Sequence, residues 1–236
     1  MIRFYAPEIE TNGVLPESES GHVTRVLRKQ AGDHIFVVDG KGYCYECEIT
    51  RPHPKATEVE IISKTAEADT WSGKITVAIA PTKNIDRIEW FVEKAVEMGI
   101  DRIVLLKCRH SERKNVNLDR IEKIMVSAMK QSLKAKLPEL EGLVEFNDFV
   151  EADRSNSRFI GYCDKETERK VFAKEYRPGS DVTVVIGPEG DFSPEEIEAA
   201  RKFDFLPVTF GDARLRTETA ALFTMAAIHT INQLNS

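Results

Sequence analysis

The sequence predicts an α/β protein in two parts: a small β-barrel with one inserted helix over residues 1–70, and a parallel sheet flanked by helices over residues 71–236. The first part is a series of short β-rich segments separated by turns. The second alternates apolar strand-like runs with amphipathic helical segments, which is the pattern of a parallel sheet. A polar stretch without periodicity, ISKTAEADTWSG (62–73), is the expected linker.

Three segments of the first part are expected to be strands, because their residues alternate or are rich in β-branched types. They are HIFVVDG (34–40), YCYECEIT (43–50) and TEVEIIS (57–63). The exception is GHVTRVLRKQ (21–30), which reads as a helix. Its apolar side would hold Val23, Val26 and Leu27. Its opposite side would be basic, with His22, Arg25, Arg28 and Lys29.

In the second part, five apolar runs are expected to be strands: 74–82, 101–108, 158–163, 181–187 and 204–211. Four periodic segments are expected to be helices: 85–99, 118–132, 193–203 and 217–234. The third helix has clear start signals, because Ser193 can cap it, Pro194 suits its first position and Glu196 completes a capping box. Gly99 is the expected end of the first.

The last helix, TETAALFTMAAIHTINQL, is apolar on nearly all sides. We expect Thr217 to cap it. A helix with so little polar face is expected to be buried on most sides, in a core or in a dimer interface.

Charge and composition restrict the function classes. The chain has 33 basic and 39 acidic residues, a net charge of −6, yet residues 107–136 contain nine Lys/Arg and only three acids. This basic stripe can bind RNA or another anion, or it can be a solvated helix face.

The chain has no apolar run long enough to cross a membrane and no signal-peptide pattern at Met1, so we expect a cytoplasmic protein without membrane contact. Cys44 and Cys47 have CxxC spacing but lie on opposite faces of a strand, so we expect no metal site.

VVIGPEGDFSPEEIEAA (184–200) reads as a buried strand, a glycine turn and a helix. Such a junction often holds a phosphate, yet this turn contains Glu189 and Asp191 and lacks the lysine of a P-loop. A ligand that is cationic at its reactive end suits the two carboxylates better, and S-adenosylmethionine is one. The alternative is an ordinary turn between strand and helix.

A second loop, FGDARLRTETAAL (210–222), leads into the last helix and places Asp212, Arg214 and Arg216 ahead of it. These groups can belong to a ligand site. Alternatively, Arg216 can form a salt bridge with Glu218 or Glu189.

These two loops resemble the signature loops of the SPOUT (trefoil-knot) methyltransferases, and more narrowly the family that methylates N3 of a uridine in 16S ribosomal RNA. Three further stretches match: HVTRVLRKQAGD (22–33), PTKNIDRIEWFVEKAVEMGID (81–101), and SER of HSERK (110–114) with KQS (130–132). The resemblance implies a PUA-like barrel, an α/β knot that binds S-adenosylmethionine, a homodimer, and action on the small (30S) ribosomal subunit. Asp191 departs from the family pattern, where a second glycine is frequent.

From the two loops and the resemblance we predict the site residues. The cofactor is expected to contact Ile186, Gly187, Pro188, Gly190, Leu206, Gly211, Leu215, Arg216 and Thr217. Arg216 is the first candidate to stabilise a uracil anion, and Glu189 is a possible base or a partner of the cofactor's positive groups. RNA is expected to contact His22, Arg25, Arg28, Lys29, Lys83, Arg87, Arg113 and Lys114.

Three other functions remain open at this point. Another SPOUT-type base or ribose methyltransferase would share these loops. A non-catalytic RNA-binding protein would account for the barrel and the basic stripe but not for the loops. An enzyme acting on a nucleotide phosphate would need a basic residue in the glycine turn, and the turn has none.

Overall fold

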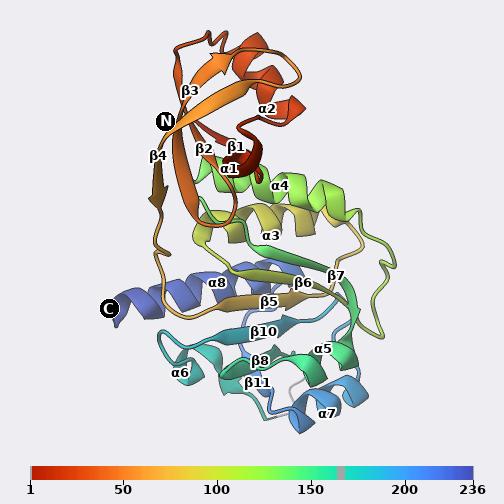
Figure 1. The fold of residues 1–236 in the computed structure, drawn as a ribbon. Coiled ribbons are helices and arrows are strands. Elements are labelled where there is room, and N and C mark those ends of the chain that lie inside the picture. Colours follow the sequence, from red (N-terminus) through yellow and green to blue (C-terminus); the bar gives the residue numbers. More distant parts are fainter. Residues whose placement is uncertain (1, 164–167, 236) are drawn as a thin grey trace. The chain divides into compact units, whose positions relative to one another are not determined.

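The computed structural model describes residues 2–163 and 168–235 (Figure 1). The chain forms two compact units. One consists of Met1–Asp69 and Met125–Leu137, and the other of Thr70–Ile124 and Pro138–Ser236. Each unit has a hydrophobic core of its own.

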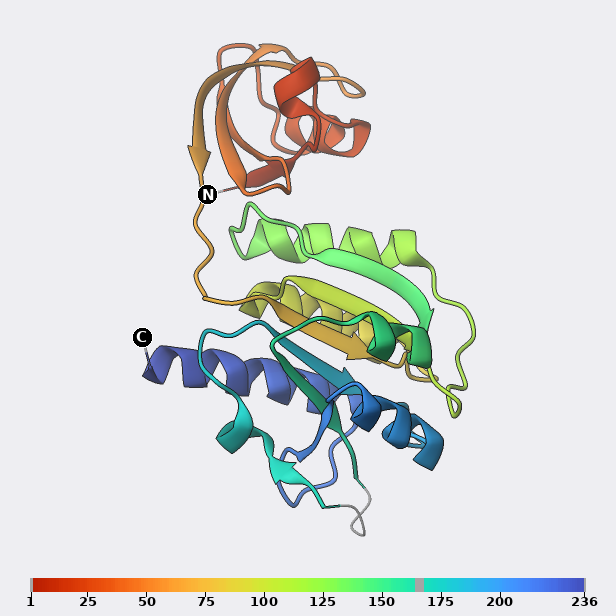
Figure 2. The same ribbon diagram turned by 60° about the horizontal axis from the view of Figure 1, so that its bottom comes forward.

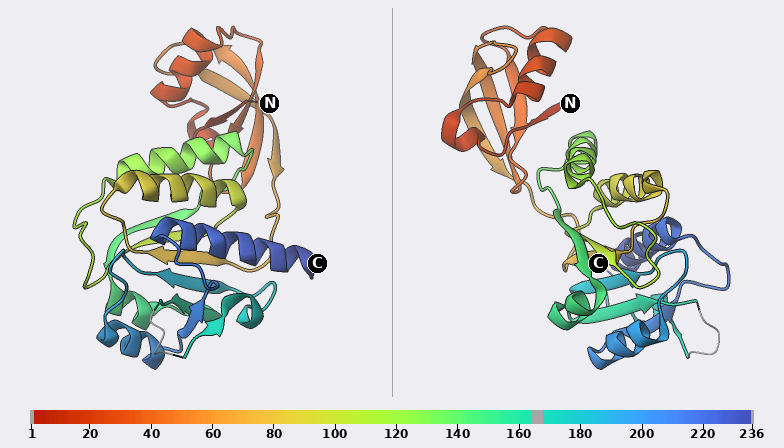
Figure 3. Two further views of the ribbon diagram at one scale, coloured as in Figure 1. Left: turned by 180° about the vertical axis from the view of Figure 1, so that it is seen from behind. Right: turned by 90° about the vertical axis from the view of Figure 1, so that its right-hand side faces the viewer.

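The first unit is built on a sheet in the order β1-β2-β3-β4. Its strands are β1 (Arg3–Tyr5), β2 (His34–Val38), β3 (Tyr43–Arg51) and β4 (Glu58–Ala66). β1 pairs with β2 in parallel, and the other pairs are antiparallel. Figures 1 and 3 show that the sheet is curled. The core of this unit includes Phe4, Ile9, Val37, Tyr45 and Ile49. The predicted small β domain is therefore confirmed.

The end of β4 lies inside the predicted linker 62–73, so residues 62–66 belong to a strand and the start predicted for the linker is wrong. β3 supplies partners for the backbone as far as the pair Tyr43↔Ala66. The ammonium of Lys64 lies 4.1 Å from the centre of the Tyr43 ring. The end of β4 can consist of polar residues because its backbone hydrogen bonds to β3, and not burial of its side chains, hold it in the sheet.

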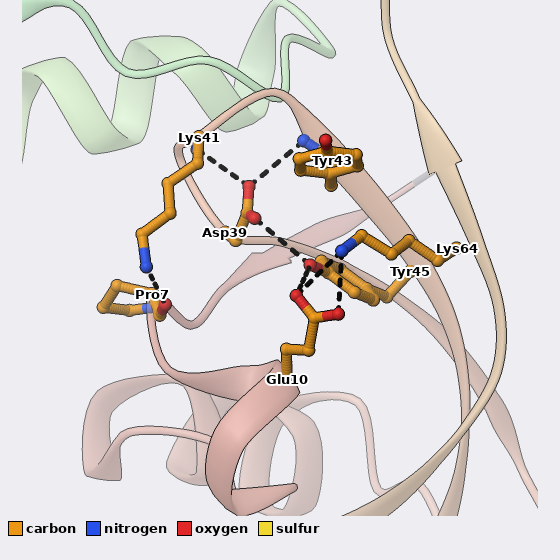
Figure 4. Close-up of polar contacts among 7 residues, drawn as sticks. All are labelled: Pro7, Glu10, Asp39, Lys41, Tyr43, Tyr45 and Lys64. Atoms are coloured by element: carbon orange, nitrogen blue, oxygen red, sulfur yellow. Dashed lines mark hydrogen bonds and ion pairs between the residues drawn. The ribbon is translucent and has the colours of Figure 1, made fainter.

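A polar network fixes the hairpin between β2 and β3 (Figure 4). Asp39, which is buried, accepts hydrogen bonds from the backbone N–H groups of Lys41 (2.7 Å) and Tyr43 (3.1 Å). The Tyr45 hydroxyl lies 3.2 Å from Asp39 and 3.1 Å from Glu10. Burial, followed by the hydrogen bond to Glu10, raises the pKa of Tyr45, so the hydroxyl stays a donor. The network ties helix α1 (Ile9–Asn12) to the strands.

The helix predicted over 21–30 begins and ends four residues earlier than expected, and its second half is a π-helix. It consists of α2 (Glu17–Gly21) and a π-helical turn, η1 (His22–Val26), in which Leu27 N–H bonds to the carbonyl of His22. A π-helix has more residues per turn than an α-helix, so the 3.6-residue periodicity does not apply. Val23 is buried as predicted, but Val26 is 66% exposed.

The second unit contains a sheet of seven strands in the order β7-β6-β5-β10-β8-β11-β9, and every pair is parallel. The strands are β5 (Ile75–Ile79), β6 (Arg102–Lys107), β7 (Glu139–Glu145), β8 (Ser157–Gly161), β9 (Lys170–Val171), β10 (Val182–Ile186) and β11 (Leu206–Thr209). The predicted α/β class with a parallel sheet is confirmed. β7 and β9 were not predicted.

Helices cover both faces of this sheet (Figure 2). The helices of this unit are α3 (Ile85–Met98), α5 (Phe146–Ala152), α6 (Phe172–Glu175), α7 (Pro194–Lys202) and α8 (Thr217–Leu234). α4 (Leu118–Gln131) belongs to this unit as far as Ile124 and to the first unit from Met125. α5 and α7 pack together on one face, and α3 and α8 on the other. The four helices predicted from periodicity are present. The two additional ones, α5 and α6, are too short for periodicity to be recognised.

The predicted capping box of α7 is present: the Ser193 side chain accepts from the Glu196 N–H, and the Glu196 carboxylate accepts from the Ser193 N–H. For α8 the prediction is wrong, because Arg216 occupies the N-cap position. The hydroxyl of Thr217 donates instead to the carbonyl of Gly187 at 3.1 Å, which joins the start of α8 to the glycine turn.

α8 is not buried on all sides. Ala221, Met225 and Ile228 are buried, whereas Phe223 is 45% exposed. The exposed face is uncharged and consists of Thr219, Phe223, Ala226 and Thr230. Within the described residues, α8 and the other helices fall short of the length and hydropathy needed to span a bilayer.

Candidate functional site

A cavity of about 1180 Å³ lies where β8, β10 and β11 end. Carboxyl ends of parallel strands are the usual ligand-binding edge of an α/β sheet. The walls come from three loops: 161–163 after β8, the turn after β10, and 208–217 after β11. Arg87, Arg169 and Ala220 complete the lining.

The turn after β10 is tight because its residues approach each other closely. A Cβ atom on Gly187 would lie 3.0 Å from the ring of Phe192, which is buried in the core. The N–H of Asp191 donates to the carbonyl of Pro188 at 3.0 Å, and Asp191 itself has a φ of 62°, in the left-handed region. Gly187 therefore brings the backbone of the turn to the cavity wall.

The two carboxylates of this turn bind neighbouring loops. Oε1 of Glu189 accepts from the backbone N–H of Lys83 at 3.0 Å. Oδ2 of Asp191 accepts from the N–H of Cys163 at 3.1 Å, and Oδ1 accepts from the N–H of Phe192 at 2.9 Å. Both residues also line the cavity. The carboxylates thus hold loops in place and make this part of the wall negative.

Four arginines line the same cavity: Arg87, Arg169, Arg214 and Arg216. Nε of Arg87 lies 3.9 Å from Glu218, which is only 7% exposed. Arg169 donates to the carbonyl of Tyr162 at 2.9 Å. Of the two acids considered as partners for Arg216, Glu189 accepts from Lys83 N–H, and Glu218 faces Arg87 through Oε1 while its buried Oε2 has no hydrogen-bond partner among the described residues. Arg216 lines the cavity at the start of α8.

Most residues predicted to contact the cofactor line this cavity: Ile186, Gly187, Pro188, Gly211, Leu215, Arg216 and Thr217. Two do not. Leu206 is the first residue of β11, at the opposite end of the strand, and Gly190 packs against His110. Tyr162, Cys163 and Arg169 also line the cavity but were not predicted as site residues. Tyr162 and Cys163 could have been found, because the predicted strand 158–163 ends at this edge of the sheet.

Most of the basic stripe is engaged within the chain. Ion pairs join Lys107 to Glu145, Arg109 to Glu195, Arg120 to Glu89, Lys130 to Glu19 and Lys136 to Asp69. Arg113 donates to the backbone carbonyls of Thr82 and Lys83. The ammonium of Lys83 lies 3.0 Å from Glu112, which raises the pKa of Lys83. Lys114 is exposed. Much of the stripe's positive charge is therefore balanced locally.

The four basic residues between positions 22 and 29 of the first unit differ in exposure. Arg25 and Arg28 are exposed, and Arg28 has a φ of 54°. His22 packs edge-on against the ring of Phe4, with centroids 5.7 Å apart. Lys29 lies 3.9 Å from Asp33.

In residues 2–163 and 168–235, no group of three or more His, Cys, Asp or Glu side chains is arranged to hold a metal ion. Cys44 and Cys47 are free thiols. Burial is the main cause that raises the pKa of Cys47 to about 12.

Comparison with known proteins identifies the family. Residues 69–229 match the model of an RNA methyltransferase domain, and residues 15–62 match that of an RNA methyltransferase PUA domain. A probable rRNA-methyltransferase from Porphyromonas gingivalis has a similar structure, with 41% identity, all of both chains covered and a TM-score of 0.95.

Two further relatives carry a more specific name. Ribosomal RNA small subunit methyltransferase E from Neisseria gonorrhoeae, solved with bound S-adenosyl methionine, is 28% identical over 98% of each chain, with a TM-score of 0.84. The protein of the same name from Aquifex aeolicus is 28% identical over 93% of this chain and 95% of its own.

The resemblance seen in the two loops is thus confirmed. The RNA methyltransferase domain model alone matches more than half of the chain, and the chain belongs to the RNA methyltransferase family.

Proposed function

We propose that this protein uses S-adenosylmethionine to methylate N3 of a uridine in 16S ribosomal RNA. The observation that carries the proposal is one cavity in which a glycine turn, three carboxylates and four arginines meet. Relatives named small subunit methyltransferase E support the choice of substrate. The volume of about 1180 Å³ exceeds the roughly 300–1000 Å³ of a usual small-molecule site, so a cofactor and a base can share it.

The cavity suits this cofactor by its chemistry. Gly187, Pro188 and Gly211 present backbone to it, and the carboxylates of Glu189, Asp191 and Asp212 favour a ligand with positive groups. A phosphate would face these like charges at close range. When bound, S-adenosylmethionine supplies an electrophilic methyl group on a sulfonium sulfur. The residues 186–188 and 211–217 would hold it.

The chain's own task is to make N3 of uracil nucleophilic. N3 carries a proton at neutral pH, and its loss leaves a negative charge shared with the two carbonyl oxygens, O2 and O4. A guanidinium in a site shielded from water stabilises such an anion electrostatically. Arg216, which lines the cavity at the start of α8, is our candidate for this role, and Arg87, Arg169 and Arg214 are the other arginines of the lining. Lys83 is directed to Glu112 instead.

The rival functions differ in what they require. A ribose methyltransferase of the same fold class would use the same cofactor but leave the base unchanged. A non-catalytic RNA-binding protein would not need the cavity. An enzyme acting on nucleotide phosphates would need a lysine in the turn after β10, which has none between Gly187 and Phe192.

The direct test is incubation of unmodified 16S RNA, and separately of 30S particles, with labelled S-adenosylmethionine. We expect label on N3 of one uridine, located by digestion. We expect Arg216→Ala to lower kcat by about 10²–10³-fold, as on removal of one donor from a developing anion. Label on a ribose or on another base would contradict the proposal, as would full activity of the variant.

Glu189 either takes the proton from N3 or holds the loop at Lys83 in place, and two variants separate these roles. Glu189→Gln keeps an acceptor for the Lys83 N–H but cannot take a proton, whereas Glu189→Ala loses both functions. We expect the Gln variant to retain kcat within about twofold and the Ala variant to lose at least about fivefold, the effect of one lost hydrogen bond. Equal, large losses in both variants would identify Glu189 as the base.

We also propose that the protein is a homodimer. The uncharged face of α8 with Phe223 (45% exposed) and the indole of Trp90 on α3 (44% exposed) support an apolar interface on the second unit. Sedimentation equilibrium at micromolar concentration should therefore give about twice the chain mass of 26.7 kDa. A mass near that of one chain would refute the dimer, and Phe223→Glu should shift the equilibrium toward it.

RNA docking is proposed to use the exposed basic residues of the first unit. Replacing Arg25 and Arg28 by Ala removes two phosphate contacts, so RNA affinity should fall and the salt slope should flatten by roughly two units. Affinity for the cofactor should not change, since both arginines belong to the other unit. Filter binding at several salt concentrations measures this. An unchanged slope would leave the exposed Lys114 and the paired residues of the basic stripe as the RNA contacts.

A further inference from the structure

We infer that Asp191 is a positioning residue for the cavity: its side chain continues the ladder between β8 and β10 beyond the end of β10, and so fixes the wall formed by Tyr162 and Cys163. The inference rests on the proposed function for the identity of the ligand.

The ladder between these strands stops before the cavity. β8 and β10 pair in register as far as Gly161↔Ile186. The next N–H of β8, from Tyr162, donates to Val208 of β11 at 3.2 Å. Successive N–H groups of a strand point to opposite neighbours, so the N–H of Cys163 faces β10. There β10 has ended and the chain turns away at Gly187 and Pro188.

Asp191 supplies the acceptor that β10 no longer provides. Its Oδ2 lies 3.1 Å from the Cys163 nitrogen, and its Oδ1 lies 2.9 Å from the nitrogen of Phe192. Phe192 is 3% exposed and packs on Phe146, with ring centroids 5.3 Å apart. One carboxylate therefore links the cavity wall to a residue that is fixed in the core.

A third loop is attached to the same residue. Nδ1 of His110 lies 3.1 Å from the carbonyl oxygen of Asp191, which holds the loop after β6 against the turn. The chain thus concentrates three loop contacts on the residue with the least favourable backbone of the turn.

Asp191 has a backbone conformation that favours glycine. A φ of 62° is free of strain only for glycine, and Asp tolerates it mainly by bonding locally. Asp204 provides a matched comparison, with a φ of 61° and an exposed side chain that only approaches Arg158 at 3.9 Å. Replacement by Gly relieves the same backbone strain at both positions, but only at 191 does it release a cavity wall.

The consequence concerns ligand binding. Tyr162, Cys163 and Asp191 all line the cavity. A wall that is already fixed loses little freedom when a ligand binds, whereas a loose wall must be ordered at that moment and weakens affinity.

The experiment compares Asp191→Gly with Asp204→Gly in the full chain. Calorimetry gives the Kd for S-adenosylmethionine, and amide hydrogen exchange gives the protection of Cys163. For Asp191→Gly we expect a Kd about fivefold to tenfold higher, the scale of one lost hydrogen bond, together with faster exchange at Cys163. Asp204→Gly should change neither quantity.

A second variant reports on the side chain itself. Burial, and then the Asp191 carboxylate, raise the pKa of the Cys163 thiol. Asp191→Asn removes the charge and keeps the side-chain size, so the pH midpoint for reaction of Cys163 with a thiol reagent should move downward. An unmoved midpoint would mean that the carboxylate is not beside Cys163 in solution, and the inference would fail.

The outcomes separate this inference from the proposed function. If the wild-type protein binds the cofactor and Asp191→Gly binds it within twofold, the positioning role is wrong, even if exchange at Cys163 accelerates. If the wild-type protein does not bind S-adenosylmethionine, the proposed function fails, and the exchange rate alone decides whether Asp191 holds the wall.

Discussion

The second unit depends on one buried strand, β10, which pairs with β5 on one side and β8 on the other. All five of its residues, VTVVI, are buried, because helices cover both faces of the sheet. A strand covered on both faces is mostly apolar, which is why it can be recognised in the sequence. The cavity lies at the end of this strand, so its position follows from the pairing. The loops after β8 and β11 reach the same place because their strands run parallel to β10.

The basic residues of the stripe and the acidic residues of the cavity both have partners within the chain, but the two sets differ in how easily a ligand can replace those partners. The ion pairs of the basic stripe are mostly exposed, as for Arg109 and Glu195, whose side chains are 63% and 71% accessible. Exposed pairs contribute little to stability, so a phosphate can replace the acid at small cost. The stripe can therefore serve RNA at low salt without lowering the stability of the free protein. In the cavity, by contrast, the acids hold backbone groups and cannot be released without moving a loop.

The sequence predicted the elements whose signals are local. The capping box of Ser193 and Glu196 is formed by residues three positions apart, and the buried strands are recognised by their apolar runs. β7 was missed because its residues alternate only weakly between exposed and half-buried. The π-helical turn at His22–Val26 was missed because a period of 3.6 residues was assumed. Cavity residues such as Arg169 could not be found, since they come from segments that become neighbours only through the order of the strands.

The two carboxylates in the glycine turn were interpreted in the sequence as a clue to the ligand, but the structure gives them a second meaning. Aspartates at strand ends accept backbone N–H groups throughout the chain. Asp39 binds Tyr43 N–H, Asp181 binds Lys74 N–H, and Asp101 binds Ile75 N–H. A strand that ends inside a protein leaves N–H groups that need acceptors, and a short carboxylate reaches them without further backbone. Part of the net charge of −6 is therefore structural, and an acidic composition here is no argument against a polyanionic partner. In the turn after β10 the same carboxylates line the cavity, so one set of groups both completes the sheet edge and determines the charge that the ligand meets.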